Sequence, residues 1–148
     1  MVVIGILAIL LAITLIAINP ARQFGQANNT KRRSDVLQIL NAVHQYVAEN
    51  QGNLPAEIES LAANTVTVFN PTNFPLLCGQ LVTNYLPALP TDPSLNAATI
   101  TDCTNGAGGW QEVGSTLTTG YAIARDANDR VTVSAPTTDN AAVISVTR

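Results

Sequence analysis

The chain begins with a long apolar segment, and charged side chains appear only after it. Residues 1–18 are apolar at every position except Gly5 and Thr14, and the first charged side chain is Arg22. A helix of this length is about 27 Å long, close to the ~30 Å thickness of the hydrocarbon core of a bilayer. The segment therefore predicts an apolar helix that lies in lipid or packs against other helices.

The helical pattern continues beyond this segment. Residues 21–50 contain no proline, and Gly25 is their only glycine. Apolar side chains recur there with the period of an amphipathic helix, namely Val36, Leu40, Val43 and Val47, with Leu37, Ile39 and Tyr46 beside them. We expect a single helix of up to ~50 residues, whose last third packs on a globular domain.

Two features weaken this helix near its middle. Pro20 has no N–H to give to the carbonyl of Ile16, and Gly25 lowers the helix propensity of the next turn. We expect a kink or local unwinding at Asn19, Pro20 and Gly25. A simple bend where the helix leaves a membrane is the alternative.

Basic residues cluster on the same helix. Four of the seven in the chain are Arg22, Lys31, Arg32 and Arg33. The cluster predicts contacts with lipid head groups or with acidic residues of a neighbouring subunit. An ordinary solvated helix face explains it equally well.

The remaining residues predict a small head. Residues 54–62 predict a short helix with Pro55 at or near its first position. Alternating apolar residues predict three strands at 121–125, 130–135 and 143–147, joined by short turns. These strands form an antiparallel meander, and the apolar stripe of the long helix is the natural cover for one of its faces.

The expected fold class is thus α+β, with a long N-terminal helix packed on a C-terminal antiparallel meander. We divide the chain into an apolar helix (1–20), its amphipathic continuation (21–53) and the head (54–148). A further short strand is expected within residues 66–69, in an otherwise irregular stretch of the head.

Composition narrows the class of protein. Apolar residues make up 47% of the chain, charged residues only 11%, and the net charge is -3. Seven basic against ten acidic residues predict no specific affinity for nucleic acid. Low charge with many threonines and asparagines is typical of an extracellular protein rather than a cytosolic enzyme.

Both cysteines of the chain, Cys78 and Cys103, lie in the head. In an oxidising compartment they predict a disulfide, which closes a loop region of the head. In the chain-entropy picture, a loop of this size is worth about 3 kcal/mol of stability. Two separate buried thiols are the alternative.

Motifs for catalysis are absent from the sequence. The one histidine, His44, has no potential partner ligand nearby, and no Walker loop, HExxH, CxxC or Gly-x-Ser-x-Gly motif occurs. We expect no enzyme activity and no cofactor. Asp126, Asn128 and Asp129 are candidate Ca²⁺ ligands, although a hairpin turn alone explains these residue types.

Several stretches resemble one known family. Residues 2–10, 17–24 and 32–36 resemble the N-terminal helix of type IV pilins and type II secretion pseudopilins. In the head, the run Tyr-Leu-Pro-Ala-Leu-Pro-Thr-Asp-Pro at 85–93 resembles a loop of major pseudopilins, and Gly-Tyr at 120–121 before the meander is similar as well.

The resemblance implies a type IV pilin-like fold and a subunit that polymerises with identical copies. It implies a precursor in the bacterial cytoplasmic membrane, then an extracellular filament, with the pilus assembly machinery and a prepilin peptidase as partners. Family members begin with Phe-Thr-Leu-Ile-Glu-Leu after a basic leader. This chain starts inside that motif, so we expect its beginning to be truncated.

The expected function is that of a structural subunit of an extracellular pilus-like helical filament. The side chains expected in the filament core are Val2, Ile4, Gly5, Leu7, Ala8, Leu11, Ala12, Leu15 and Ile18. A major pseudopilin of a secretion system is the alternative within the family. A membrane-anchored binding module that does not polymerise is the alternative from another class.

Overall fold

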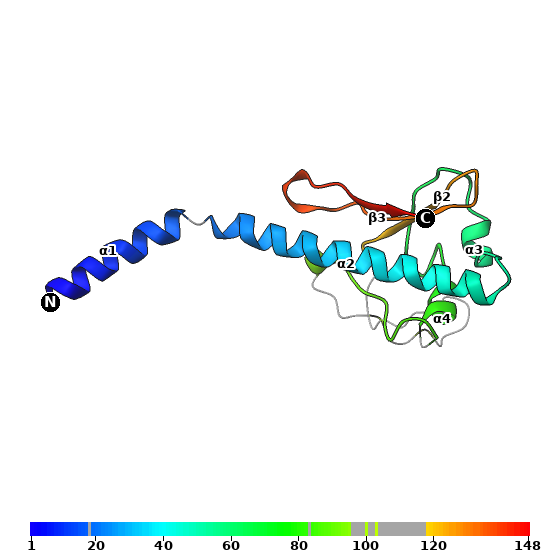
Figure 1. Cartoon of the computed structure of the whole chain (residues 1–148), viewed down its shortest axis with the longest axis horizontal. Coiled ribbons are helices and arrows are strands. Elements are labelled where there is room, and N and C mark those ends of the chain that lie inside the picture. The colour runs from blue at the N-terminus through cyan, green and yellow to red at the C-terminus, as the bar shows by residue number, and fades with distance from the viewer. Residues whose placement is uncertain (18, 83, 96–99, 101–102, 104–117) are drawn as a thin grey trace.

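The computed structural model describes residues 1–17, 19–82, 84–95, 100, 103 and 118–148. Its fold class is α+β. The elements are α1 (Val2–Ala17), α2 (Pro20–Glu49), α3 (Ala56–Glu59), β1 (Thr67–Val68), α4 (Leu77–Leu81), η1 (Pro93–Leu95), β2 (Ala122–Arg125), β3 (Val131–Ala135), η2 (Asp139–Ala141) and β4 (Ile144–Thr147). In Figure 1, α1 projects away from the rest of the molecule, and α2 runs along the sheet.

The predicted interruption at Asn19 and Pro20 is confirmed, because α1 ends at Ala17 and α2 begins at Pro20; the expectation of one continuous helix is therefore wrong. Asn19 is the N-cap of α2, and its side-chain oxygen accepts the N–H of Arg22 at 3.4 Å. Pro20 follows in the first turn of α2. Asparagine is a favoured N-cap. Proline is favoured as the first residue of a helix, because the N–H at that position has no partner within the helix. Together they favour the start of a new helix at Pro20.

Helix α2 ends at Glu49, with Asn50 as its C-cap. Gln51 has a φ of 59° and takes the left-handed position directly after the cap residue Asn50, and Gly52 follows with a φ of 91°. The N–H of Gly52 donates to the carbonyl of Val47 at 2.9 Å, which closes a Schellman-type end.

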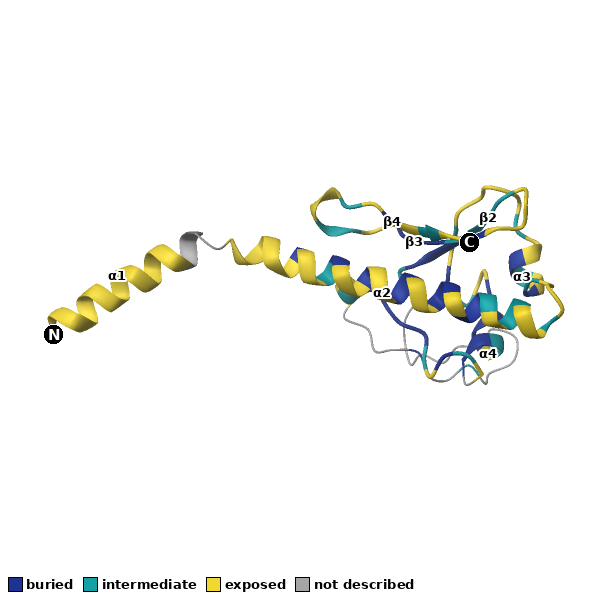
Figure 2. Ribbon diagram, in the orientation of Figure 1, coloured by how far each residue is buried: buried dark blue, intermediate teal, exposed yellow. Residues whose placement is uncertain are grey.

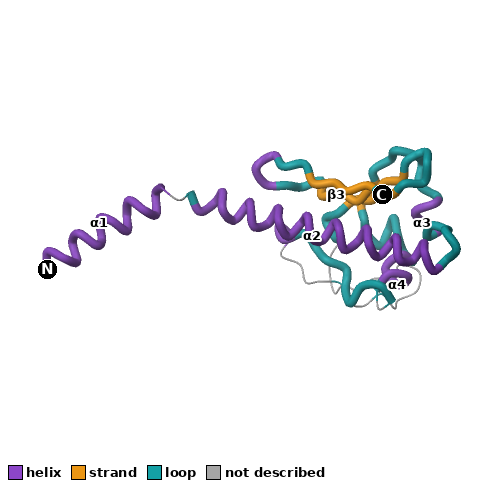
Figure 3. Tube along the Cα trace, in the orientation of Figure 1, coloured by secondary structure: helices purple, strands orange, loops and turns teal. Residues whose placement is uncertain are grey.

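The sheet has four antiparallel strands in the order β1-β2-β3-β4. The predicted three-stranded meander is confirmed as β2, β3 and β4. The short strand expected within 66–69 is confirmed as β1, and it adds to the edge of the meander by pairing with β2, with Thr67 opposite Ile123. Figure 3 shows the strands lying above α2, with the connection between β3 and β4 reaching towards α1.

The core lies between α2 and the sheet. The helix contributes Val36, Ile39, Leu40 and Val43, all fully buried, as the apolar stripe predicted. Figure 2 shows this buried stripe along the side of α2 that faces the rest of the head. Leu37, on the other side of the helix, is 39% exposed, as a helical period requires.

The disulfide between Cys78 and Cys103 is confirmed, with 5.5 Å between the two Cα atoms. Cys78 lies in α4 and is fully buried in the core. The N-terminus of α4 is held from α3, because the Glu57 carboxylate accepts the N–H groups of Leu76 and Leu77 at 2.9 and 2.8 Å. The disulfide and the Glu57 contacts therefore hold α4 in place at two points.

Candidate functional site

Helix α1 exposes apolar side chains on every face. The large aliphatic side chains from Val2 to Ile13 are all more than half exposed, from 54% at Leu7 to 77% at Val2. The predicted core residues Val2, Ile4, Leu7 and Leu11 belong to this set, whereas the side chain of Leu15 and all of Ile18 lie outside the described part. In water such a helix is not stable alone, and a helix that is apolar all round is normally buried.

The described part of α1 offers little polar surface to water. Thr14 is the only polar side chain among residues 1–18. Its hydroxyl donates to the carbonyl of Leu11 at 3.0 Å, so the helix satisfies it internally. The surface of α1 is therefore suited to an apolar environment and provides no side-chain hydrogen bond to direct a polar partner.

One face of α1 carries small residues, so the helix backbone lies close to the surface there. Gly5, Ala8 and Ala12 are spaced three and four positions apart and so share a face. No atom lies within 4 Å of the position where a Cβ of Gly5 would stand. A second helix can therefore approach the backbone of α1 closely along this face, which is the geometry that helices use to pack without a strong hydrophobic driving force.

Where α2 begins, it is held to the head by the β3–β4 connection. Asn29 and Asp139 exchange two hydrogen bonds: the Asn29 amide donates to the Asp139 carbonyl at 2.6 Å and accepts its N–H at 3.1 Å. A Cβ at Gly25 would stand 2.7 Å from the Asn140 amide nitrogen and 2.9 Å from the Asp139 Cβ. The prediction of unwinding at Gly25 is wrong: α2 is continuous there, and the glycine permits a close contact.

The basic cluster divides into two kinds of side chain. Arg32 is buried, and its guanidinium donates to both Asp92 carboxylate oxygens at 2.7 and 2.9 Å, to the Asp139 carboxylate at 2.7 Å and to the side-chain oxygen Oδ1 of Asn29 at 2.9 Å. The prediction that Arg32 pairs with a neighbouring subunit is therefore wrong. No local pattern indicates this network, because its carboxylates lie 60 and 107 residues away from Arg32 along the chain.

Electrostatics favour the charged forms of Arg32, Asp92 and Asp139. Burial acts to raise the pKa of Asp92, but hydrogen bonds from Arg32 and Ser94 outweigh it, and the net pKa lies below the ordinary value. The Arg32 hydrogen bond lowers the pKa of Asp139. Hydrogen bonding to Asp92 raises the pKa of the arginine further.

The other basic side chains are more exposed. Lys31 donates to Asp35 at 2.7 Å and to the Thr91 carbonyl at 3.0 Å, yet its side chain is 47% exposed. Arg22 and Arg33 are exposed and form no ion pair with any residue that the structure describes. These two remain as predicted contacts for lipid or for a neighbouring copy.

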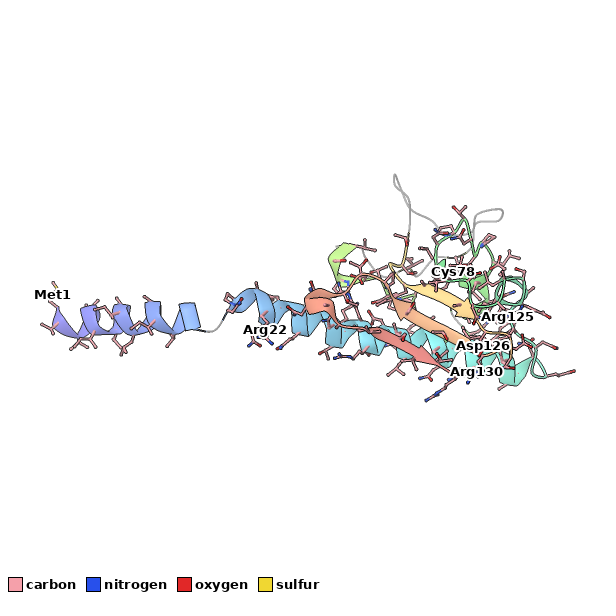
Figure 4. The ribbon with its side chains drawn as sticks, turned by 90° about the horizontal axis from the view of Figure 1, so that it is seen from above. Met1, Arg22, Cys78, Arg125, Asp126 and Arg130 are labelled. Atoms are coloured by element: carbon pink, nitrogen blue, oxygen red, sulfur yellow. A yellow bond between two sulfur atoms is a disulfide. The ribbon has the colours of Figure 1, made fainter. Side chains whose placement is uncertain are left out.

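The candidate Ca²⁺ residues form the β2–β3 turn. Asp126 accepts the N–H groups of Asn128 and Arg130 at 2.8 and 2.9 Å, and the Arg130 guanidinium at 2.6 Å. Asp129 accepts the Arg125 guanidinium at 2.6 Å. Figure 4 shows Arg125, Asp126 and Arg130 together at one end of the head. Both carboxylates are thus already bound by arginine side chains. The described residues hold no group of three acidic, histidine or cysteine side chains placed for a metal.

The single histidine is half-buried on α2. Its Nε2 is buried and has no hydrogen-bond partner among the described residues. Burial lowers the pKa of His44, and the nearby charge of Arg148 lowers it further. Among the residues that the structure describes, His44 has neither a second ligand for a metal nor a hydrogen-bonded carboxylate for acid–base catalysis.

No family model, curated protein or solved structure matches this chain, so the functional argument rests on its own geometry. Among the helices of the described residues, none combines the length and the apolarity that crossing a membrane requires.

Proposed function

We propose that the protein is a structural subunit that polymerises into an extracellular, type IV pilus-like helical filament through α1. The observation that carries the proposal is the exposure of α1: nine large aliphatic side chains of this one helix stand free of the head. A disulfide-closed α+β head on such a helix is suited to a subunit whose helix is covered by identical copies.

The energy of covering α1 supports a polymer that is stable in water. Burial of a large aliphatic side chain contributes about 1.5–3 kcal/mol, so nine of them contribute roughly 14–27 kcal/mol before the entropy of association is subtracted. Within lipid this driving force is absent, and close packing along Gly5, Ala8 and Ala12 takes its place. The same apolar surface is thus suited to lipid before assembly and to a helix bundle afterwards.

The geometry of contact favours a fibre over a closed ring. The apolar surface surrounds α1 on all sides, so one helix can be contacted by several neighbours at different heights. A head-to-tail contact whose rotation does not close produces an open helical assembly. The type IV pilin-like arrangement, with its assembly machinery, prepilin peptidase and extracellular location, is the form of this polymer that the resemblance of residues 2–24 supports.

Electron microscopy of the purified full chain tests the proposal. After removal of detergent we expect long fibres of uniform width, with the helices in the centre and the heads outside. Replacing Leu7 and Leu11 together by Asp places two charges in the helix bundle and is expected to abolish fibres while the head keeps its disulfide and its circular dichroism.

A matched control comes from the head. Val66 is 63% exposed, nearly the same as Leu11 at 62%, but it lies far from α1 in the sequence. Val66→Asp is expected to leave fibre formation intact. A monodisperse single particle in detergent-free buffer, amorphous aggregate in place of fibres, or fibres that persist in the double aspartate variant would each contradict the proposal.

A further inference from the structure

The end of α2 farthest from α1 forms an open pocket. It has a volume of about 400 Å³ and is lined by Tyr46, Glu49, Asn50, Gln51 and Asn53. In Figure 1 this end of α2 lies at the opposite side of the molecule from the N-terminus. A ligand here would therefore meet the part of the chain that remains in solution when α1 is covered.

Two tyrosines hold the wall of this pocket in place. The rings of Tyr46 and Tyr85 meet edge to face, with 6.2 Å between their centroids. The Tyr85 hydroxyl donates to Glu49 Oε2 at 2.7 Å, so a residue from another part of the head orients the carboxylate. A side chain that is already fixed loses less conformational entropy when a ligand binds, which favours affinity.

The helix end fixes the polar groups around the wall. The Asn50 amide donates to the Tyr46 carbonyl at 2.8 Å, which leaves its side-chain oxygen as an acceptor. Gln51 takes the left-handed position and begins the turn that carries Asn53. The side chains of Gln51 and Asn53 make no hydrogen bond with other described residues, so both amides are available to a ligand.

The chemistry of the lining selects the class of ligand. Each of the three amide side chains, at Asn50, Gln51 and Asn53, offers both a donor and an acceptor. A metal or ammonium ion could use only the acceptors, and an anion only the donors. One carboxylate, from Glu49, adds acceptors for hydroxyl groups. An aromatic ring beside planar amides and a carboxylate fits a neutral polyhydroxylated ring, whose C–H face packs on the aromatic and whose hydroxyls both donate and accept.

A second hollow shares the lining residue Asn53 with the first. It has a volume of about 140 Å³ and is lined by Gly52, Asn53, Leu54, Glu59 and Asp129. Because Asn53 belongs to both hollows, one ligand can pass from one to the other across its side chain. The pair therefore matches a ligand longer than one ring.

We propose that the end of α2 binds a neutral oligosaccharide, with its first ring on Tyr46 and its hydroxyls on Glu49, Asn50, Gln51 and Asn53. The site does not depend on polymerisation. If the chain also forms a fibre, repeated copies would add avidity to a modest affinity for each copy.

A printed array of neutral and amino-bearing oligosaccharides tests the proposal on the full chain. The chain is kept monomeric in lauryldimethylamine oxide, a detergent without a sugar head group that could occupy the site. We expect binding to at least one neutral oligosaccharide. Gln51→Gly, which suits the left-handed backbone, and Asn53→Ala are each expected to weaken binding about tenfold, as the loss of one or two hydrogen bonds implies.

Gln45→Ala serves as the matched control, since Gln45 is an exposed amide on the same helix turn that does not line the pocket. It is expected to bind as the unchanged chain does. Because a variant could disturb the fold, chemical-shift mapping of the unchanged chain with the best array ligand gives a second readout, with changes expected at residues 46–53. An array without neutral ligands, shifts elsewhere, or undiminished binding in both variants would overturn the proposal, whether or not the chain forms fibres.

Discussion

Arg32 illustrates how a single residue secures this head. It lies 1% exposed between Asp92, which is equally buried, and Asp139, whose side chain is partly open to solvent. A buried ion pair gains little net stability over apolar residues of the same size, but removing one partner leaves an uncompensated charge. The network therefore holds η2 and the 91–95 segment against α2 by making every alternative arrangement costly.

Replacing Arg32 by Ala is expected to destabilise the head by about 3–5 kcal/mol, because Asp92 would remain buried without its partner. Denaturant unfolding followed by far-ultraviolet circular dichroism measures this loss. Arg33→Ala, an exposed neighbour on the same helix, is expected to change stability by no more than about 0.5 kcal/mol. Equal effects of the two substitutions would contradict the buried network.

At the scale of the element, α2 serves two parts of the molecule with one continuous helix. Its C-terminal half buries the apolar stripe under the sheet, and its N-terminal half is covered by the β3–β4 connection (Figure 3). Gly25 decides how closely this connection lies on the helix, since Asp139 and Asn140 occupy the space of a side chain there. The close contact at this glycine thus keeps the β3–β4 connection against the N-terminal half of α2.

Gly25→Ala is expected to destabilise the head by roughly 1–2 kcal/mol, although alanine is the better helix former, because its Cβ displaces the connection. The measurement is the unfolding midpoint in denaturant. Gly5→Ala is the matched control, since nothing lies within 4 Å of that position and the head's stability should not change. A stabilised Gly25→Ala variant would show that the connection yields at no cost.

At the scale of the whole molecule, ionisation links the separate parts of the head. The folded pKa of His44 lies below its ordinary value of 6.5, because burial disfavours the charged form. The folded pKa values of Asp92 and Asp139 lie below the ordinary 3.8. In all three cases the unfolded chain takes up protons at a higher pH than the folded chain does, so stability falls as pH falls.

We expect two successive losses of thermal stability on acidification. The contribution of His44 is complete above pH 6.5 and is lost as pH falls through that value towards the folded pKa. The contribution of Asp92 and Asp139 is complete above pH 3.8 and is lost as pH falls through their folded pKa values. Melting temperature against pH measures both. His44→Gln should remove only the first loss, and a melting temperature that rises on acidification would contradict the assignment.

Local patterns in the sequence were sufficient for several features of the fold. The apolar period of α2 predicted its buried side, because helical spacing places every third or fourth residue on one face. Alternation predicted β2, β3 and β4 for the corresponding reason in a strand. The interruption at Asn19 and Pro20 was also predicted, but the cap and the first-turn proline make it the start of a new helix rather than a kink within one.

The candidate site was predicted only in part. Composition alone identified α1 as an apolar helix. Neither the exposure of its apolar side chains nor its face of small residues at Gly5 depends on contacts with distant residues. The roles of Arg32 and Gly25 did need distant residues, from 60 to more than 100 positions away. The pocket at the end of α2 also depends on Tyr85, which is 36 positions from Glu49.

Local pattern and composition were enough to identify the segments of this protein: an apolar helix, an amphipathic helix, three strands with alternating apolar residues, and two cysteines able to pair. Periodicity and composition are local properties, and they need no knowledge of neighbours in space. Which charges are buried, where β1 pairs and which glycine permits a close contact became known from the folded chain alone. These depend on the approach of residues far apart in the chain, which is set by the packing of the whole head and by no local pattern.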